Sequence, residues 1–279
     1  MEENFDYIIV GAGSAGCVLA NKLSESKKNT VLVIEAGGKD TNLFIHMPSG
    51  YSQIVPNSSK LNYGFETEPE INTAGRKLFW PRGRGWGGSS SINAMIYTRG
   101  HSSDYDHWRQ LGNPGWSYDD VLPYFKRAEN YEGDGDEEFH GKNGPLNVKK
   151  STRNDDILLD KFVEAGSQAG FPLTKDFNGK QQEGFSRYEH TIKGSKRFSS
   201  ARAYLHPALK RKNLYTKINI TVDKVIFENK KAIGIEYIDK GKRVFCRGNK
   251  EIILSSGAVN SPQILMRSGI GDSEEIKKH

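Results

Sequence analysis

Three glycines mark the part of the sequence that could hold a ligand. Gly11, Gly13 and Gly16 form the pattern GxGxxG between a strand predicted over residues 7–10 and a helix predicted to run to about residue 24. In such a turn the first glycine permits a tight bend, the second lets the backbone approach a pyrophosphate, and the third lets helix and strand pack closely. The phosphates then lie at the helix N-terminus, so the pattern predicts dinucleotide binding.

An acidic residue supports this prediction. A second strand, predicted over residues 30–34, is followed directly by Glu35. A carboxylate about 20 residues beyond the glycines is expected to accept hydrogen bonds from the adenosine ribose hydroxyls, which favours an unphosphorylated ribose over that of NADP. The loop and the acid together do not separate NAD from FAD.

A second glycine-rich segment covers residues 80–108, WPRGRGWGGSSSINAMIYTRGHSSDYDHW. It contains no GxxxxGK[ST] phosphate loop, and its GGSSS run is not the GxSxG turn of a hydrolase. Gly87 and Gly88 would let the backbone press against a flat ligand. Ser89 to Ser91 are expected to cap a helix that begins near Asn93.

Two segments of the sequence, one in its first half and one near its end, resemble signature motifs of a known family. Residues 81–100 resemble the first signature of the glucose-methanol-choline oxidoreductases, the FAD-dependent alcohol oxidases and dehydrogenases, and residues 257–271 resemble the second. The intervening sequence is similar to the choline-dehydrogenase-like branch, over essentially all of the 279 residues. By this resemblance the ADP half of FAD contacts Gly11, Gly13, Ser14, Ala15, Gly16 and Glu35, the isoalloxazine ring lies against Gly85, Asn93, Ala94, Met95 and Ile96, and the adenine contacts Val222.

The resemblance also implies the chemistry. Members of the family transfer a hydride from the alcohol carbon to flavin N5 while a histidine takes the hydroxyl proton. That histidine belongs to a C-terminal segment that this sequence does not match. His101 and His107 are expected to have surface or helix-capping roles, so no catalytic residue and no metal ligand is assigned. Some relatives tether the flavin to a histidine where this chain has Ile92, which predicts non-covalent FAD.

The sequence leaves three hypotheses for the function. The first is the N-terminal part of an FAD-dependent alcohol dehydrogenase that acts on a small alcohol and needs a separate C-terminal polypeptide. The second is a vestigial or partner-dependent FAD-binding module without catalysis. The third, an NAD-dependent reductase, leaves both flavin-type signatures unexplained.

Composition narrows the class of protein. The formal net charge of +6 comes from dispersed lysines without interleaved aromatics, which argues against nucleic-acid binding. No stretch approaches the run of about 18 apolar residues that a membrane helix needs. The first residues, MEENFDY, lack the basic and apolar parts of a signal peptide, so a cytoplasmic location is expected. Cys17 and Cys246 are expected to be small core residues.

The expected fold is α/β. A Rossmann-like FAD-binding domain with an antiparallel β-meander is predicted from residues 1–155 and 214–279, and 156–213 are expected to begin a substrate domain.

Four local elements are predicted in detail. The sequence predicts a helix capped by Ser117, a second helix over 155–169, and the meander over 223–254. It also predicts a last helix with Ser261 as N-cap and Pro262 as its first residue.

Overall fold

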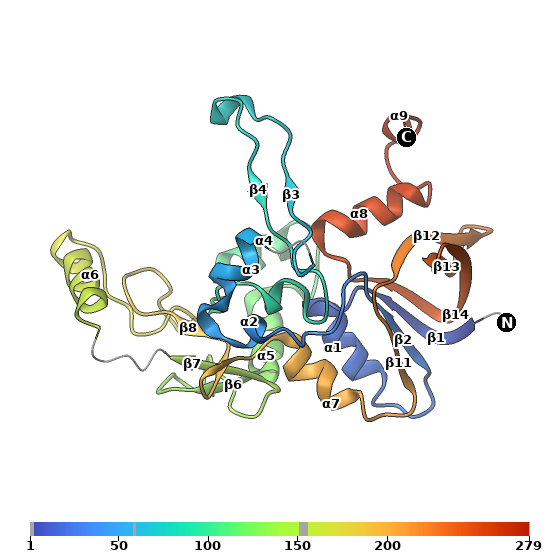
Figure 1. Cartoon of the computed structure of the whole chain (residues 1–279). Helices are drawn as coiled ribbons and strands as arrows, with labels where there is room; N and C mark the ends of the chain where they lie inside the picture. Colours follow the sequence, from blue (N-terminus) through green and yellow to red (C-terminus); the bar gives the residue numbers. More distant parts are fainter. Residues whose placement is uncertain (1–2, 58–59, 151–155, 279) are drawn as a thin grey trace. The chain divides into compact units, whose positions relative to one another are not determined.

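The computed structural model describes residues 3–57, 60–150 and 156–278, which form two compact units (Figure 1). The first unit comprises Met1–Asn93 and Ser199–His279, and the inserted unit comprises Ala94–Phe198. These limits differ from the predicted ranges because strands on both sides of residue 155 pair with one another in the inserted unit. The assignment of an FAD-binding domain and a substrate domain stays a prediction.

A six-stranded sheet organises the first unit, in the order β11-β2-β1-β14-β13-β12. The first four strands are parallel neighbours, and β13 and β12 continue the sheet antiparallel. The expected meander is therefore confirmed, and its last strand, β14, pairs in parallel with β1 and so joins the meander to the parallel strands. The strands are β1 (Glu3–Val10), β2 (Val31–Ile34), β11 (Leu214–Lys217), β12 (Thr221–Glu228), β13 (Lys231–Asp239) and β14 (Lys242–Leu254).

Both faces of this sheet are packed. One face carries a core that joins the parallel strands to the meander and to helix α8 (Gly257–Arg267) through Ile264. Helix α1 (Ser14–Leu23) packs against β1 and β2 and buries Cys17 and Ala20. Cys246 is also buried, and both cysteines are free thiols, as expected. The continuous apolar run of β2, buried at every residue, is typical of a strand in a parallel sheet covered on both faces.

Helix α8 corrects one prediction. It begins at Gly257 rather than at Pro262, so Ser261 and Pro262 lie inside the helix. Gly257 has φ +80°, which lets the chain turn sharply from β14 into the helix. Ser261 still acts as a side-chain acceptor, because its Oγ binds the backbone N–H of Ser256 at 3.0 Å.

Short elements complete the first unit. A hairpin formed by β3 and β4 extends from it (Figure 1). The remaining elements are α2 (Leu43–His46), α3 (Tyr51–Asn57), β3 (Phe65–Glu66), β4 (Phe79–Trp80), α7 (His206–Ala208) and α9 (Ser273–Ile276), with 3-10 turns at Pro48–Gly50, Ile71–Thr73 and Gly88–Ser91 and a π-helical turn at Ala201–Leu205.

The inserted unit has a four-stranded sheet in the order β5-β8-β7-β6 and a two-stranded hairpin. Helix α5 has Ser117 as its N-cap, in a capping box with Asp120, as the sequence predicts. Helix α6 is capped by Asp156, and residue 155 lies outside the described residues. The elements are β5 (Ile96–Tyr97), α4 (Ser102–Gln110), α5 (Tyr118–Ala128), β6 (Glu129–Glu132), β7 (Leu146–Lys150), α6 (Ile157–Gln168), β8 (Glu189–His190), β9 (Ile192–Lys193) and β10 (Lys196–Arg197).

A buried histidine, His140, links two carboxylates from different segments of the inserted unit. His140 Nδ1 lies 3.0 Å from Glu129 Oε2, and its Nε2 lies 2.6 Å from Asp176 Oδ2. Its ring stacks on Tyr131 with centroids 3.9 Å apart, and Arg99 pairs with the same Glu129 oxygen at 3.0 Å. Burial lowers the pKa of His140, but the two carboxylates outweigh this effect and raise it to about 9. The imidazolium therefore holds two carboxylates that would otherwise repel each other.

This histidine predicts a pH-dependent stability. Because its pKa is raised in the folded chain from 6.5 to about 9, its contribution is complete below 6.5 and is lost as the pH rises through about 9. We expect the free energy of unfolding, measured by urea titration with tryptophan fluorescence, to fall across this window. His140→Gln should remove that slope and cost about 3–5 kcal/mol at neutral pH, because it breaks a buried ion pair. The exposed His107→Gln is the control, and an unchanged slope in His140→Gln would refute the role.

Candidate functional site

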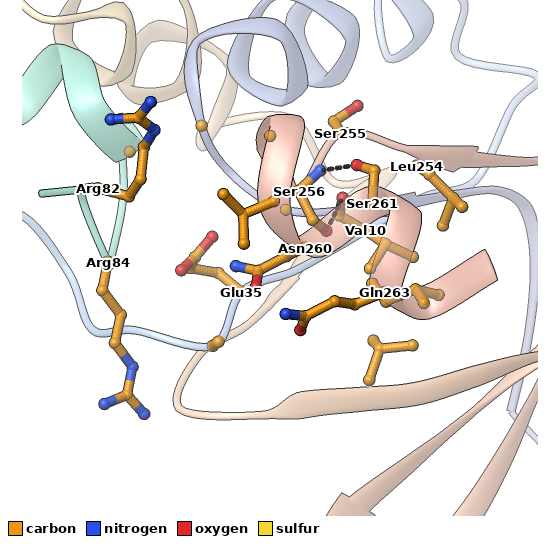
Figure 2. A pocket seen from close by; sticks show the side chains of 18 of the residues that line it. Val10, Glu35, Arg82, Arg84, Leu254, Ser255, Ser256, Asn260, Ser261 and Gln263 are labelled. Atoms are coloured by element: carbon orange, nitrogen blue, oxygen red, sulfur yellow. Dashed lines mark hydrogen bonds between the residues drawn. The ribbon is translucent and has the colours of Figure 1, made fainter. Parts of the chain in front are cut away.

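A cavity of about 740 Å³ opens at the carboxyl edge of the parallel sheet (Figure 2). In the sheet register Val10 pairs with both Ile34 and Leu254, so three strands end at the same level. The residues that follow these strands, Gly11, Glu35 and Ser255, all line the cavity. Ligands of open α/β sheets bind at this edge, beyond the carboxyl ends of the strands.

The three glycines of the turn have different surroundings. Gly11 has φ +101°, and a Cβ there would lie 2.6 Å from the carbonyl oxygen of Ser255. A Cβ on Gly16 would lie 1.9 Å from the carbonyl oxygen of Gly11, so Gly16 allows close packing of helix on turn. A Cβ on Gly13 would meet no atom nearer than 3.7 Å and would enter the cavity itself. Gly13 therefore leaves a space that suits the close approach of a ligand backbone such as a pyrophosphate.

Two helices begin at this cavity. Ser14 and Ala15, the first residues of α1, line it, and the N-cap Gly13 has no side chain to occupy their N–H groups. Gly257 and Ala258, at the start of α8, line it as well. The first N–H groups of a helix lack intrahelical partners, and the helix dipole makes this end positive. The cavity thus has two places suited to an anionic group.

The carboxylate of Glu35 is occupied by backbone donors. Its Oε2 accepts from Ala12 N at 2.8 Å, and its Oε1 accepts from Gly37 N at 2.8 Å and Gly85 N at 3.0 Å. Burial raises the pKa of Glu35, against the opposing effect of these donors and of the charge on Arg84. Glu35 therefore ties three segments together, a role that the sequence did not indicate. Oε2, with a single donor, retains room for one more hydrogen bond.

Arginines from the second glycine segment also line the cavity. The guanidinium of Arg82 lies 4.4 Å from the ring centroid of Trp80, and that of Arg84 lies 5.8 Å from that of Tyr63. The buried Nε of Arg84 has no hydrogen-bond partner among the described residues. These cations add to the positive helix ends, so the described lining favours a ligand with negative charge.

Polar side chains of α8 form another part of the lining. Figure 2 shows Asn260 and Gln263 extending from this helix toward the space beside Glu35. Arg267, one turn further on, pairs with Asp223 of β12 and donates through Nε to its backbone oxygen at 3.1 Å. This pair fixes α8 against the meander.

Several of these cavity-lining residues were not predicted from the sequence. The arginines stand in the quoted PRGRG run, and Asn260 and Gln263 have the i, i+3 spacing of one helix face, so both signals were present.

The predicted contact residues are distributed as follows. Val222 lines the cavity from β12, and Gly85 is connected to it through its hydrogen bond to Glu35. Asn93 ends the N-terminal part of the first unit, whereas residues 94–96 belong to the inserted unit. Their contact with a flavin ring stays a prediction.

The helix expected to begin near Asn93 is absent. Residues 88–91 form a single 3-10 turn, and strand β5 follows at Ile96. The backbone explains this, because Gly87, Gly88 and Met95 all have positive φ. Met95 is buried as well, and a non-glycine residue held at φ +64° is the kind of strain that often accompanies a binding site.

Together, the parallel sheet, the glycine turn and the acid that follows β2 define a Rossmann-like nucleotide-binding fold. Comparison with known proteins gives the family. Residues 5–279 match the GMC oxidoreductase family, N-terminal part, and the chain belongs to that family. It is 46% identical to human mitochondrial choline dehydrogenase over an alignment of 285 residues, which covers 99% of this chain and 47% of that protein.

Other relatives agree with this assignment. The oxygen-dependent choline dehydrogenase of Vibrio vulnificus (strain YJ016) is 46% identical over 281 residues, 100% of this chain and 50% of that protein. Among solved structures, pyridoxine 4-oxidase from Mesorbium loti superposes with a TM-score of 0.93 at 34% identity, over 98% of this chain and 53% of that one. An FAD-dependent oxidoreductase from Chaetomium thermophilum gives a TM-score of 0.89 at 30% identity, over 99% of this chain and 49% of its own. The chain thus spans about half the length of these relatives and matches their N-terminal half.

The space at Gly13 predicts a selective loss of ligand binding. We expect Gly13→Val to keep the fold, since Gly13 has φ −74° and no protein atom near its Cβ, but to abolish binding of FAD used as the probe. Flavin absorbance that stays with the protein after gel filtration measures this. Lys230→Ala, in the β12–β13 turn, should bind like the parent. Equal FAD retention by the valine variant would place the pyrophosphate elsewhere.

The contacts of Glu35 predict a loss of stability without any ligand. Glu35→Ala leaves three buried N–H groups without their acceptor, and each unsatisfied donor costs about 1–3 kcal/mol. We expect a lower free energy of unfolding for the ligand-free variant, measured by chemical denaturation, and a smaller loss for Glu35→Gln, which keeps one acceptor oxygen. A stability equal to that of the parent would show that the three donors find water instead.

Proposed function

We propose that this chain is the FAD-binding N-terminal portion of an oxidoreductase that oxidises the CH–OH group of a small alcohol, with choline as the model substrate. The observation that carries the proposal is the cavity at the carboxyl edge of the sheet. It combines the glycine turn, two helix N-termini and Glu35, in a chain with the identity to choline dehydrogenases given above.

The described residues fit the ADP half of FAD. The open space at Gly13 and the first N–H groups of α1 would receive the pyrophosphate, with Arg82 and Arg84 adding positive charge. The remaining acceptor position on Glu35 Oε2 would take a ribose hydroxyl, which supports an unphosphorylated ribose. Val222 would lie against the adenine. Asn260 and Gln263 offer amide groups to the same ligand.

FAD would supply the hydride acceptor of the reaction. In this proposal the proton acceptor is none of the described histidines that already have a polar partner. His101 accepts from Ser103 N as the cap of α4, His140 is held between two carboxylates, and His206 pairs with Asp40 at 2.9 Å. Since general-base help is worth about 10²–10⁴ in rate, a chain lacking it should be nearly inactive.

We propose non-covalent FAD. Ile92 stands where the sequence resemblance places the tethering histidine of some relatives, and its buried side chain packs with Ile45 and Ile54. A hydrocarbon side chain offers no nucleophile to the flavin.

A cytoplasmic location stays a prediction from the composition. No helix among the described residues is long and apolar enough to cross a membrane.

The proposed function predicts a chain that binds FAD but does not oxidise choline by itself. We expect the purified chain, saturated with FAD, to release all of its flavin on acid denaturation, because no covalent bond holds it. Under anaerobic conditions choline should leave the flavin absorbance unchanged, because in this proposal none of the described residues serves as the proton acceptor.

Two results would contradict this prediction. Yellow colour that remains with the precipitated protein would show covalent flavin. Bleaching by choline that His101→Gln abolishes would show that this histidine serves as the base. Ethyltrimethylammonium, which is choline without its hydroxyl group, is the matched control for choline.

A further inference from the structure

Helix α6 of the inserted unit exposes an apolar face. Leu158, Phe162 and Ala165 have the i, i+4, i+7 spacing of one helix face. Leu158 is 77% exposed and Phe162 is 65% exposed, and Ile157, at the helix start, is 69% exposed. Phe171 and Leu173, just beyond the helix, are also more than half exposed. We call these six residues the α6 face.

The helix is held to its own unit by an ion pair between Asp160 and Arg187 at 2.5 Å and by packing around Phe185. Phe185 packs against Phe162 and Phe171, with ring centroids 5.5 Å apart in both pairs. Gly166 is the one buried residue of α6, and a Cβ there would lie 2.4 Å from the ring of Phe185. Backbone bonds between Thr174 and Phe185 continue the contact beyond the helix. Ile157 and Leu158 nevertheless remain largely exposed.

A helix with this little support is not stable by itself. Isolated helices shorter than about 12–15 residues are marginal in water, and packing of the apolar face supplies most of their stability. Helix α6 has 12 residues, and nearly all of its apolar side chains remain in solvent. Exposed patches of this kind mark interaction sites on soluble proteins.

The relatives indicate what covers the face. The chain matches almost entirely to about half of the human and Vibrio proteins, so those proteins carry a C-terminal half of similar length. We propose that the α6 face is the docking surface for a polypeptide equivalent to that C-terminal half, whether joined to the chain or separate. This rests on the proposed function, in which the chain is the N-terminal portion of a larger oxidoreductase.

The polar side of α6 argues against a membrane as the occupant. Asp160, Lys161 and Glu164 give it mixed charge, and Lys161 pairs with Glu164 at 2.6 Å. Helices that lie on a lipid surface typically carry lysine and arginine along the polar side. Mixed charge instead suits a protein partner with its own polar rim.

The experiment co-expresses the tagged chain with the C-terminal half of the Vibrio vulnificus relative. We expect the two to co-purify, and hydrogen exchange of the α6 amides to slow in the complex. Leu158→Glu should lower the recovered partner by about tenfold or more, because it places a charge in an apolar contact. It should leave the free chain folded, since Leu158 is exposed and a glutamate in the first turn suits the helix dipole.

The controls separate the possible causes. Ser167→Glu adds the same charge to the polar side and should leave recovery unchanged. The N-terminal half of the Vibrio relative, co-expressed with the same partner, shows that the partner is competent.

Three outcomes would overturn the docking surface. These are no association of the chain with a partner that the Vibrio half does bind, association without slower exchange in α6, or a dimer of the chain alone that Leu158→Glu disperses, which would assign the face to a second copy. FAD titration of the complex is read separately. Association without FAD binding would contradict the proposed function but not the assignment of the α6 face as a docking surface.

Discussion

The carboxylate of Glu35 is the constraint on which the cavity depends. It accepts from Ala12 in the glycine turn, from Gly37 in the loop after β2, and from Gly85 in the second glycine segment. These segments are far apart in sequence, and no other single group joins all three in the described hydrogen bonds. Placing a carboxylate there is costly, as its raised pKa shows, and the three N–H groups offset much of that cost.

The sheet register places this carboxylate. Because Val10 is level with both Ile34 and Leu254, the residues that follow three strands meet at one edge. The meander then turns back so that β12 and α8 close a second side, held by the pairing of Arg267 with Asp223. Positive helix ends and arginines therefore surround one buried acid, a distribution of charge that favours a pyrophosphate joined to a neutral, hydroxyl-bearing sugar.

The sequence predicted those features that depend on short-range chemistry. The strand, glycine turn and helix at the N-terminus, the Ser117 cap and the alternating meander are each set by residues a few positions apart. The start of α8 and the missing helix at Asn93 were predicted wrongly, because positive φ at Gly257 and Met95 is imposed by the tertiary structure.

The same limit applies to the cavity lining. The strand pairing across residue 155 and the several partners of Glu35 depend on contacts between distant segments. Hydrophobic periodicity and local motifs do not contain that information.

The division of the chain into units also sets the order in which it can fold. The inserted unit is continuous, so it can fold once residues 94–198 have been made, whereas β1 and β2 are made first and wait for β14 at Lys242–Leu254. Every residue of β2 is buried in the finished sheet, and unpaired apolar strands are prone to associate with other chains. Closing so long a loop is slow as well. The first two strands are therefore open to such association until the last strand has been made.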